Sequence, residues 1–297
     1  MPGFDRTGLK NTCLSILSES EVERIHQSAL RVLTRTGLAI HDDRVLALLA
    51  EAGCRVDDDL RHAYFPSPLV EEAVAKAPAS VMLYNRLGEP AMALGAGPFH
   101  ARTSSGATGF LDLDNGQRRE PTSQDLVDAV RLADALPHLH GVSTMAVQPA
   151  DVPVTVVDVH TVRLALANTV KPVGYVCLNE QLLEPVLLMA AAVVGGADKL
   201  RARPIITALA ESTSPLQLVP SQLAVLQAFA ARGLPLTLHA HPIAGFTAPV
   251  TLAGELVITH AEILALVTIA QLIQPGAPVV YGMSSSVPDM QSGMNLS

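Results

Sequence analysis

The chain has 297 residues, of which 49% are hydrophobic and 16% charged, so it can bury a large core and does not have the composition of a disordered protein. The formal net charge is −8 and no stretch gathers lysine and arginine, which argues against a nucleic-acid partner. The most apolar stretches, residues 182–196 and 252–273, contain charged residues or proline, and the N-terminus has no basic-then-apolar pattern. We therefore expect no membrane span and no signal peptide. Three widely spaced cysteines suit a reducing cytoplasm.

The first third of the chain, residues 1–97, is predicted to form a helical subdomain. Ser18–Glu21 has the form of a capping box, and apolar residues follow at helical spacing. A second helix is expected from Asp42, and a third from Ser67-Pro68, where proline occupies a first-turn position. These helices carry no recognisable chemistry.

From residue 98 the pattern changes to short strands that alternate with amphipathic helices. Strands are expected at Phe99–Thr103, Val142–Gln148, Val173–Leu178, Ile205–Ala210, Leu236–His241 and Val279–Met283. Helices are expected near residues 122–136, 154–169, 180–194, 217–232 and 252–274.

Repeated strand–helix units of this kind predict an α/β fold, a parallel sheet covered by helices. A doubly wound sheet and a (β/α)8 TIM-type barrel both fit the pattern. No strand-to-helix turn carries a glycine-rich nucleotide motif, so we favour the barrel. About six of the eight units are present in residues 98–297, so the predicted barrel is incomplete.

Active sites of such barrels lie at the C-terminal ends of the strands. Residues at or just after these ends are candidates for substrate contacts: Gln148, Ser214, Met283 and, further on, Asp289. Glu211 directly follows an otherwise apolar strand. Its carboxylate could hold a cationic substrate, take part in proton transfer or pair with a nearby histidine.

The fifth strand is the most informative. Because side chains alternate, His239 and His241 share one face and the apolar residues between them share the other. One interpretation is a metal-dependent barrel hydrolase, which would need a third ligand such as Cys177 or Glu211. The other is a polar pocket lined by two hydrogen-bonding histidines. We prefer the second and predict no metal site.

The loop Gly245–Gly254 is the most distinctive segment, because its glycines permit unusual backbone angles and Thr251 can cap the next helix. It is either a structural turn or a ligand-contacting loop, with Phe246 and Thr247 as its candidate contacts. These two interpretations are compatible with each other.

Several ordered motifs begin at this loop and agree with others earlier in the chain. They are Gly245–Gly254, Ala261-Glu262, Pro275–Gly282, Asp289-Met290, and earlier Leu17–Glu19, Ile25-His26, Asp114–Arg119, Ala133–Pro137, Asn168–Pro172 and Ser214–Leu216. As a set they resemble the trimethylamine/glycine-betaine methyltransferase family. The resemblance covers nearly the whole chain in the correct order.

The resemblance implies a barrel that moves a methyl group from a methylated amine to the Co(I) of a corrinoid. That corrinoid (methylcobalamin once methylated) is carried by a separate cognate protein, and no tightly bound cofactor is expected. The family typically continues well beyond residue 297, so the resemblance implies C-terminal truncation. Most relatives lack pyrrolysine and are thought to act on quaternary amines such as betaines, which makes this type the expectation. Oligomeric state stays open.

Within this interpretation, Glu211, His239 and His241 are the candidate catalytic residues. Aromatic faces and a carboxylate suit a quaternary ammonium, so Tyr175, Phe246 and Tyr281 are expected beside Glu211. Two alternatives remain: a metal-dependent hydrolase that uses His239 and His241, and a fragment that is catalytically incomplete.

Overall fold

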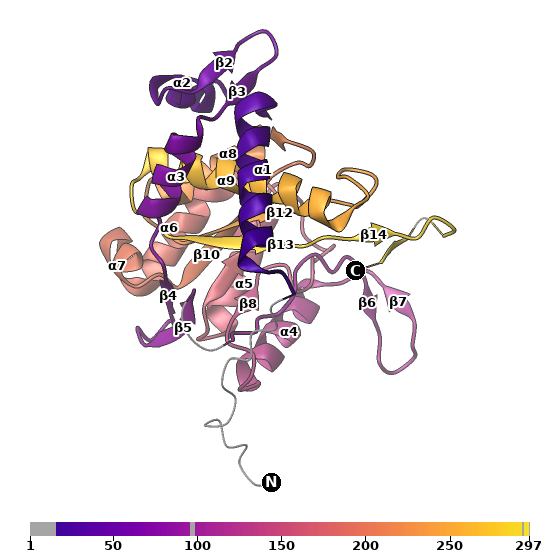
Figure 1. Ribbon diagram of the computed structural model, residues 1–297. Helices are drawn as coiled ribbons and strands as arrows, with labels where there is room; N and C mark the ends of the chain where they lie inside the picture. Colours follow the sequence, from indigo (N-terminus) through magenta and orange to yellow (C-terminus); the bar gives the residue numbers. More distant parts are fainter. Residues whose placement is uncertain (1–15, 96–98, 293, 297) are drawn as a thin grey trace.

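The computed structural model describes residues 16–95, 99–292 and 294–296. Its centre is a parallel sheet of five strands, which lie in the spatial order β13-β12-β10-β9-β8 (Figure 1). These strands are β8 (Val142–Ser143), β9 (Val173–Tyr175), β10 (Ile206–Glu211), β12 (Leu236–Ala240) and β13 (Val279–Met283). All four neighbouring pairs are parallel, which confirms the predicted α/β class.

The sheet is wound in one direction only. Each strand pairs with the central strand before it in the chain, and Arg102 continues the series by a parallel bridge to Gly141 beside β8. A doubly wound sheet would reverse its strand order at a switch point, and this one does not. The predicted first strand, Phe99–Thr103, is reduced to that single bridge.

The crossover helices match the predicted ranges to within about three residues. They are α4 (Ser123–Ala135), α5 (Val157–Asn168), α6 (Leu183–Val194), α8 (Pro220–Ala230) and α9 (Leu252–Ile273). A 3-10 turn, Glu180–Leu182, precedes α6, and the short α7 (Ala197–Ala202), which was not predicted, follows it. The strands alternate as their sequence requires: on β12, Leu236, Leu238 and Ala240 are fully buried toward the helices.

Helix α9 is the central helix of the core. It is long and apolar enough to cross a membrane by composition, but 67% of its most apolar window is buried inside the protein. It packs against α1 (Glu19–Arg35), α3 (Ser67–Lys76), α8 and the strands β12 and β13. Its apolar character is therefore explained by burial on several sides.

The expectation of an all-helical first third is wrong in part. Helices α1, α2 (Asp43–Glu51) and α3 form as predicted, but short strands lie between and after them. These strands are β1 (Leu38–Ile40), β2 (Arg55–Asp57), β3 (His62–Tyr64), β4 (Val81–Tyr84) and β5 (Pro90–Leu94). Three to five residues are too few to show a clear alternation of polarity.

The N-terminal third is attached to the rest of the chain by strand pairing as well as by the packing of side chains. Strand β1 is parallel to β11 (Gln217–Leu218), which follows the end of β10. The hairpin β4–β5 is tied to the start of β10, because the backbone N–H of Tyr84 donates to the carbonyl of Pro204 at 2.9 Å. The division of the chain at residue 97 stays a prediction.

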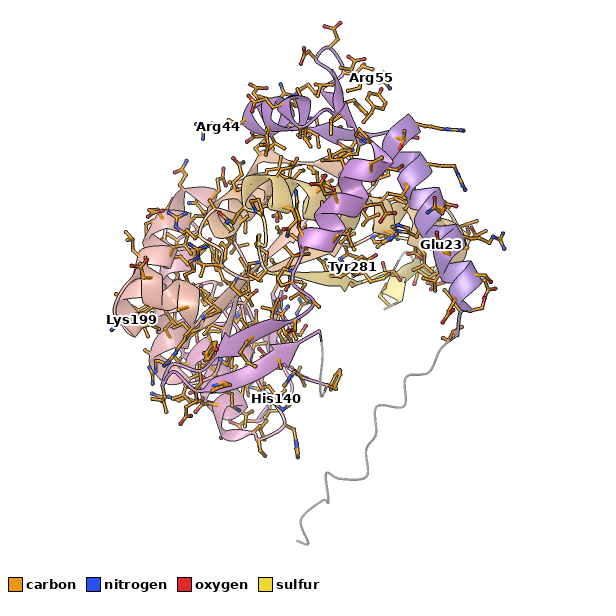
Figure 2. All side chains as sticks on the ribbon, turned by 60° about the vertical axis from the view of Figure 1, so that its left-hand side comes forward. Glu23, Arg44, Arg55, His140, Lys199 and Tyr281 are labelled. Carbon is orange, nitrogen blue, oxygen red and sulfur yellow. The ribbon has the colours of Figure 1, made fainter. Side chains whose placement is uncertain are left out.

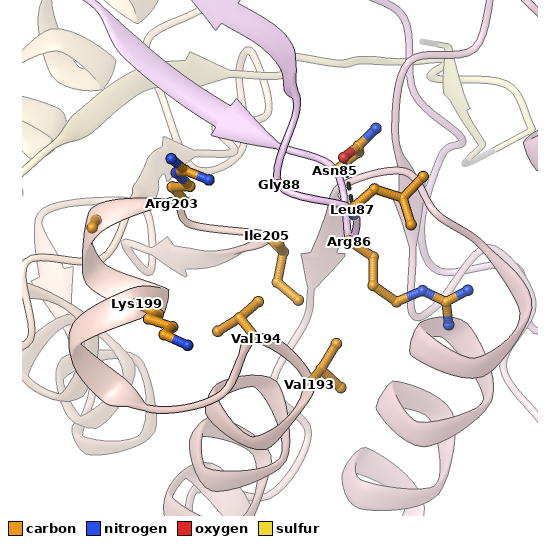
Figure 3. A pocket seen from close by; sticks show the side chains of 10 residues that line it. Asn85, Arg86, Leu87, Gly88, Val193, Val194, Lys199, Arg203 and Ile205 are labelled. Carbon is orange, nitrogen blue, oxygen red and sulfur yellow. Dashed lines mark hydrogen bonds between the residues drawn. The ribbon is translucent and has the colours of Figure 1, made fainter.

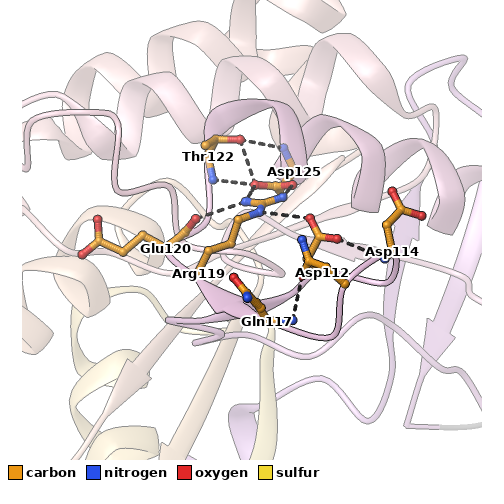
Figure 4. A network of polar contacts seen from close by, with 8 residues as sticks. Asp112, Asp114, Gln117, Arg119, Glu120, Thr122 and Asp125 are labelled. Carbon is orange, nitrogen blue, oxygen red and sulfur yellow. Dashed lines mark hydrogen bonds and ion pairs between the residues drawn. The ribbon is translucent and has the colours of Figure 1, made fainter.

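Two further hairpins were not predicted and extend to the right in Figure 1. One is β6 (Phe110–Leu111) with β7 (Arg118–Arg119), and the other is β14 (Val287–Pro288) with β15 (Asn295–Leu296). Two-residue strands carry no detectable pattern of their own. The first hairpin is joined to the start of α4 by the polar network in Figure 4.

At the centre of this network Arg119 binds Asp125 through Nη1 and Nη2 of its guanidinium, each 2.7 Å from a carboxylate oxygen. The same carboxylate accepts from the backbone N–H of Thr122 at 2.7 Å and from its hydroxyl at 2.8 Å, which completes a capping box. These bonds, with the Arg119 guanidinium first, hold the pKa of Asp125 well below its usual range. The hairpin is therefore fixed to α4 by an ionised carboxylate.

We expect Asp125→Asn to lower the free energy of unfolding at pH 7 by about 1.5–3 kcal/mol, because charge-assisted bonds are lost. Since the folded-state pKa is depressed, this contribution is complete above the unfolded pKa of about 4 and is lost as the pH falls below it. Urea denaturation at pH 7 and pH 3 should show a smaller difference at pH 3. Asp128→Asn, an exposed site on the same helix, is the control. An equal difference at both pH values would contradict the prediction.

Candidate functional site

The concave face of the sheet, opposite the helices, carries the polar side chains. Pairing in register places Glu211 level with His239, and Leu209 level with Thr237. A cavity of about 350 Å³ opens on this face. Its lining includes Arg102, Gly174, Thr207, Thr237, His239 and Gly282. The alternation predicted for the fifth strand therefore does direct His239 away from the helices.

Glu211 and His239 lie next to each other at the C-terminal ends of β10 and β12. The carboxylate Oε1 is 3.1 Å from Nδ1 of the imidazole, close enough for an ion pair when the histidine is protonated but not aligned as a hydrogen bond. Nε2 of His239 lies 3.2 Å from the hydroxyl of Ser284. The ring of His241 is 6.2 Å away from that of His239 and nearly perpendicular to it.

The side chains of Glu211 and His239 differ in how far they are exposed to solvent. The Glu211 side chain is 37% exposed and that of His239 is 16% exposed, so the carboxylate can meet a ligand that enters from solvent. Gly282 keeps the neighbouring space open, because a Cβ there would lie 2.9 Å from the Thr237 methyl and 3.2 Å from the His239 ring. The arrangement can hold a cation or transfer a proton.

Four other predicted residues also follow strand ends. Gln148 lies on the loop after β8, where its backbone N–H donates to Ala107 at 2.9 Å. Met283 ends β13, is 40% exposed and lines the cavity. Phe246 is 66% exposed, and the Thr247 hydroxyl accepts the backbone N–H of Ile243 at 2.9 Å. Their substrate-binding roles stay predictions.

Ser214 and Asp289 have structural partners. The Ser214 hydroxyl donates to the buried carboxylate of Glu262 at 2.7 Å. Asp289 accepts from the backbone of Gln291 at 3.1 Å and from both the backbone and hydroxyl of Ser292, and this hydroxyl in particular lowers the pKa of Asp289. Both residues shape their loops, and we leave them out of the proposed site.

Tyr175 lies on the helix side of the sheet. Its neighbour Gly174 faces the cavity, so Tyr175 is directed away from it and is 1% exposed. Its hydroxyl donates to Asp158 at 2.7 Å, and burial raises its pKa. Tyr175 is therefore a core residue, contrary to the expectation that it lines a cation pocket.

Tyr281 is one of the residues that line the cavity, but its hydroxyl is directed toward His260 on α9. Its hydroxyl lies 3.1 Å from the ring of His260. The His260 ring lies 2.9 Å from that of His26, and His26 pairs with Glu71 at 2.9 Å. Burial, followed by the neighbouring His26, lowers the pKa of His260 to about 4, so this ring is neutral at pH 7. Tyr175 is thus excluded from an aromatic cage beside Glu211, and the substrate-binding role of Tyr281 stays a prediction.

A larger cavity of about 540 Å³ lies near the opposite ends of the strands (Figure 3). It is lined by Arg86, Lys199 and Arg203 together with apolar residues around the start of β10. Arg86 is engaged by the carbonyl of Leu166 at 2.5 Å. Because catalytic groups of parallel sheets lie at the C-terminal strand ends, we place the site at the smaller cavity.

The alternative of a metal-dependent hydrolase gains no support from the geometry. Within the described part of the chain, no three side chains of His, Cys, Asp or Glu are arranged to hold a metal ion. Cys177 in particular lies beside Tyr175 and Asp158, and burial raises its pKa to about 11. A thiol of this kind is a poor ligand at neutral pH.

Comparison with known proteins agrees with the motifs. A family model described as trimethylamine methyltransferase (MTTB) matches residues 6–296. The trimethylamine methyltransferase MttB of Desulfitobacterium hafniense is 34% identical over 94% of this chain and 56% of its own length. A glycine betaine methyltransferase from the same species is 30% identical over 94% of this chain and 58% of its own. MttB1 of Methanosarcina acetivorans is 28% identical, with 98% and 59% covered.

Among solved structures, the monomethylamine methyltransferase of Methanosarcina barkeri aligns with a TM-score of 0.47 at 14% identity. The alignment covers 89% of this chain and 58% of that one. The chain thus spans a little over half the length of the curated relatives named above.

Proposed function

The chain belongs to the trimethylamine methyltransferase (MTTB) family, and we propose that it acts in methyl transfer from a quaternary amine, such as a betaine, to the Co(I) of a corrinoid on a separate protein. We further propose that its singly wound sheet is part of a (β/α)8 barrel. The observation that carries the function is Glu211, which is 37% exposed and lies 3.1 Å from His239, a residue that lines the concave cavity. A cytoplasmic location belongs to the same proposal.

Methyl transfer from a quaternary amine does not depend strongly on acid–base groups of the protein. The methyl carbon is attacked by a strong nucleophile, and the breaking C–N bond leaves its electron pair on nitrogen. The product is then a neutral tertiary amine that needs no proton. The protein must mainly orient the N-methyl group and hold the cation, which Glu211 is placed to do. His239 is a positioning residue for that carboxylate at 3.1 Å.

A macromolecular partner is supported by apolar side chains around the C-terminal strand ends. Leu113, Phe246, Val250, Leu252 and Met290 are between 66% and 93% exposed, and all follow strands or belong to hairpins at this end. Large exposed apolar residues that gather at one end of a protein typically mark an interaction surface. A corrinoid protein seated there would bring its methyl acceptor to the cavity.

The test is methyl transfer by the purified chain to Co(I) cobalamin, followed by absorbance, with a panel of methylated amines. We expect at least one quaternary amine to be demethylated. Isothermal titration calorimetry with tetramethylammonium, a simple quaternary cation, should accompany it. If the folded protein neither transfers a methyl group nor binds this cation, the proposed function is wrong.

A further inference from the structure

The guanidinium of Arg102 lies on the concave face of the sheet. It is further from the C-terminal ends of the strands than Glu211 is. Its backbone bridges Gly141, and its side chain crosses to β9, where a Cβ on Gly174 would lie 2.3 Å from Nη1. Gly141 and Gly174 both lack a side chain where the guanidinium crosses. The absence of side chains at these two glycines therefore leaves room for the Arg102 side chain to reach the cavity.

This guanidinium has no protein partner within the described residues, where no ion pair or side-chain hydrogen bond involves Arg102. Desolvation by surrounding atoms lowers its pKa, but a guanidinium remains charged at neutral pH. On the concave positions of β9, β10, β12 and β13, Glu211 is the only carboxylate within the described part of the chain. Among the described residues, the cavity thus presents a cation without a protein partner, and an anion lies beside its lining residue His239.

The two charges are well separated. Gly174, which the guanidinium covers, is level with Thr207 in the β9–β10 register, and Glu211 follows four residues later on β10. At about 3.3 Å per residue, the two levels are about 13 Å apart along the strand. A ligand that engages both charges must itself carry two opposite charges separated by several atoms.

Resting on the proposed function, we propose that Arg102 binds the carboxylate of a zwitterionic ω-(trimethylammonio)alkanoate whose ammonium end lies at Glu211. A methylated amine without a carboxylate leaves Arg102 unpaired, so Arg102 is the residue that selects betaines over simple amines. The spacing favours several carbons between the charges over the single carbon of glycine betaine.

Isothermal titration calorimetry on the full chain tests this with three ligands: 4-(trimethylammonio)butyrate, glycine betaine and tetramethylammonium. For the wild-type protein we expect the butyrate to bind most tightly. Arg102→Met should raise its Kd by about 10- to 100-fold, since a charge-assisted bond is lost, and leave the Kd of tetramethylammonium within about twofold. Arg102→Lys should restore part of the affinity. Arg44→Met is the matched control, because Arg44 lies on α2, far from His140 and the neighbouring Arg102 bridge (Figure 2).

The outcomes separate this inference from the proposed function. If tetramethylammonium binds but the zwitterions bind no more tightly, or if Arg102→Met weakens all three ligands equally, the role of Arg102 is wrong while the methyl-transfer proposal stands. If none of the ligands binds the folded wild-type protein, both are wrong. Should Arg102→Met fail to fold by circular dichroism, the wild-type ligand order and Arg102→Lys still decide.

Discussion

Replacing Glu211 with glutamine is expected to raise the KM for a quaternary amine by about 10- to 100-fold and to change kcat much less. The carboxylate attracts the full positive charge of the bound substrate, and that charge disappears from nitrogen as the C–N bond breaks. Glu211 therefore stabilises the bound substrate at least as strongly as the transition state, so its loss appears mainly in KM. The measurement is initial rates of Co(I) cobalamin methylation across a range of amine concentrations.

A variant of His239 and a control variant of a surface glutamate complete this experiment. His239→Asn should raise KM by a smaller factor, and the double variant should be no worse than Glu211→Gln alone, because the histidine acts through the carboxylate 3.1 Å away. Glu184→Gln is the control, since Glu184 is exposed and pairs with Arg232 outside the cavity. A Glu211→Gln enzyme with KM within twofold of wild type would remove Glu211 from the site.

The second large effect is on stability. Glu262 is fully buried on α9 and accepts hydrogen bonds from Ser212 at 2.6 Å, Ser214 at 2.7 Å and the backbone N–H of Leu216 at 2.7 Å. Leu216 has a left-handed backbone with φ of 56°, which costs about 1–3 kcal/mol and persists because surrounding interactions, such as the bond to Glu262, hold it. We expect Glu262→Ala to lower the free energy of unfolding by about 3–5 kcal/mol, because three buried or half-buried donors lose their shared acceptor.

Urea denaturation at 25 °C measures this change, and Glu255 on the same helix offers a matched control. Glu255 is 2% exposed, its Oε1 has no hydrogen-bond partner in the described residues, and burial raises its pKa. Glu255→Gln should therefore be neutral or stabilising, while Glu262→Gln should cost about 2 kcal/mol. Equal effects of the two glutamine variants would show that burial, and not the hydrogen bonds of Glu262, sets the cost.

The elements that the sequence predicted well are those with many residues and one consistent period. The crossover helices and the strands β10, β12 and β13 appear within a few residues of their expected bounds. The elements that were missed, such as β1 and the hairpins β4–β5 and β6–β7, have at most five residues per strand. Such strands form because a partner lies beside them: β1 is held by β11, 178 positions further on at Ala39↔Gln217.

For the site, the sequence predicted chemistry at the C-terminal ends of the strands, but position at a strand end does not say which way a side chain points. Alternation along the strand decides whether a side chain enters the cavity. It was applied to His239, which the structure places on the concave face, and was not applied to Tyr175, which is buried on the helix side. The same alternation applied to the predicted first strand would have placed His100 and Arg102 together on one face, and both line the cavity.

By itself the sequence determined the parallel α/β class, the family and the polar strand ends, because periodicity, ordered motifs and glycine positions are local properties of the chain. Only the tertiary structure decided the pairing of Glu211 with His239, the hydrogen bond from Ser214 to Glu262, and the position of the Arg102 guanidinium over Gly174, where it has no partner among the described residues. Each of these depends on strand register and on which residues distant in sequence become neighbours. Local pattern does not encode that information, because a shift of one residue in register reverses the face of every side chain.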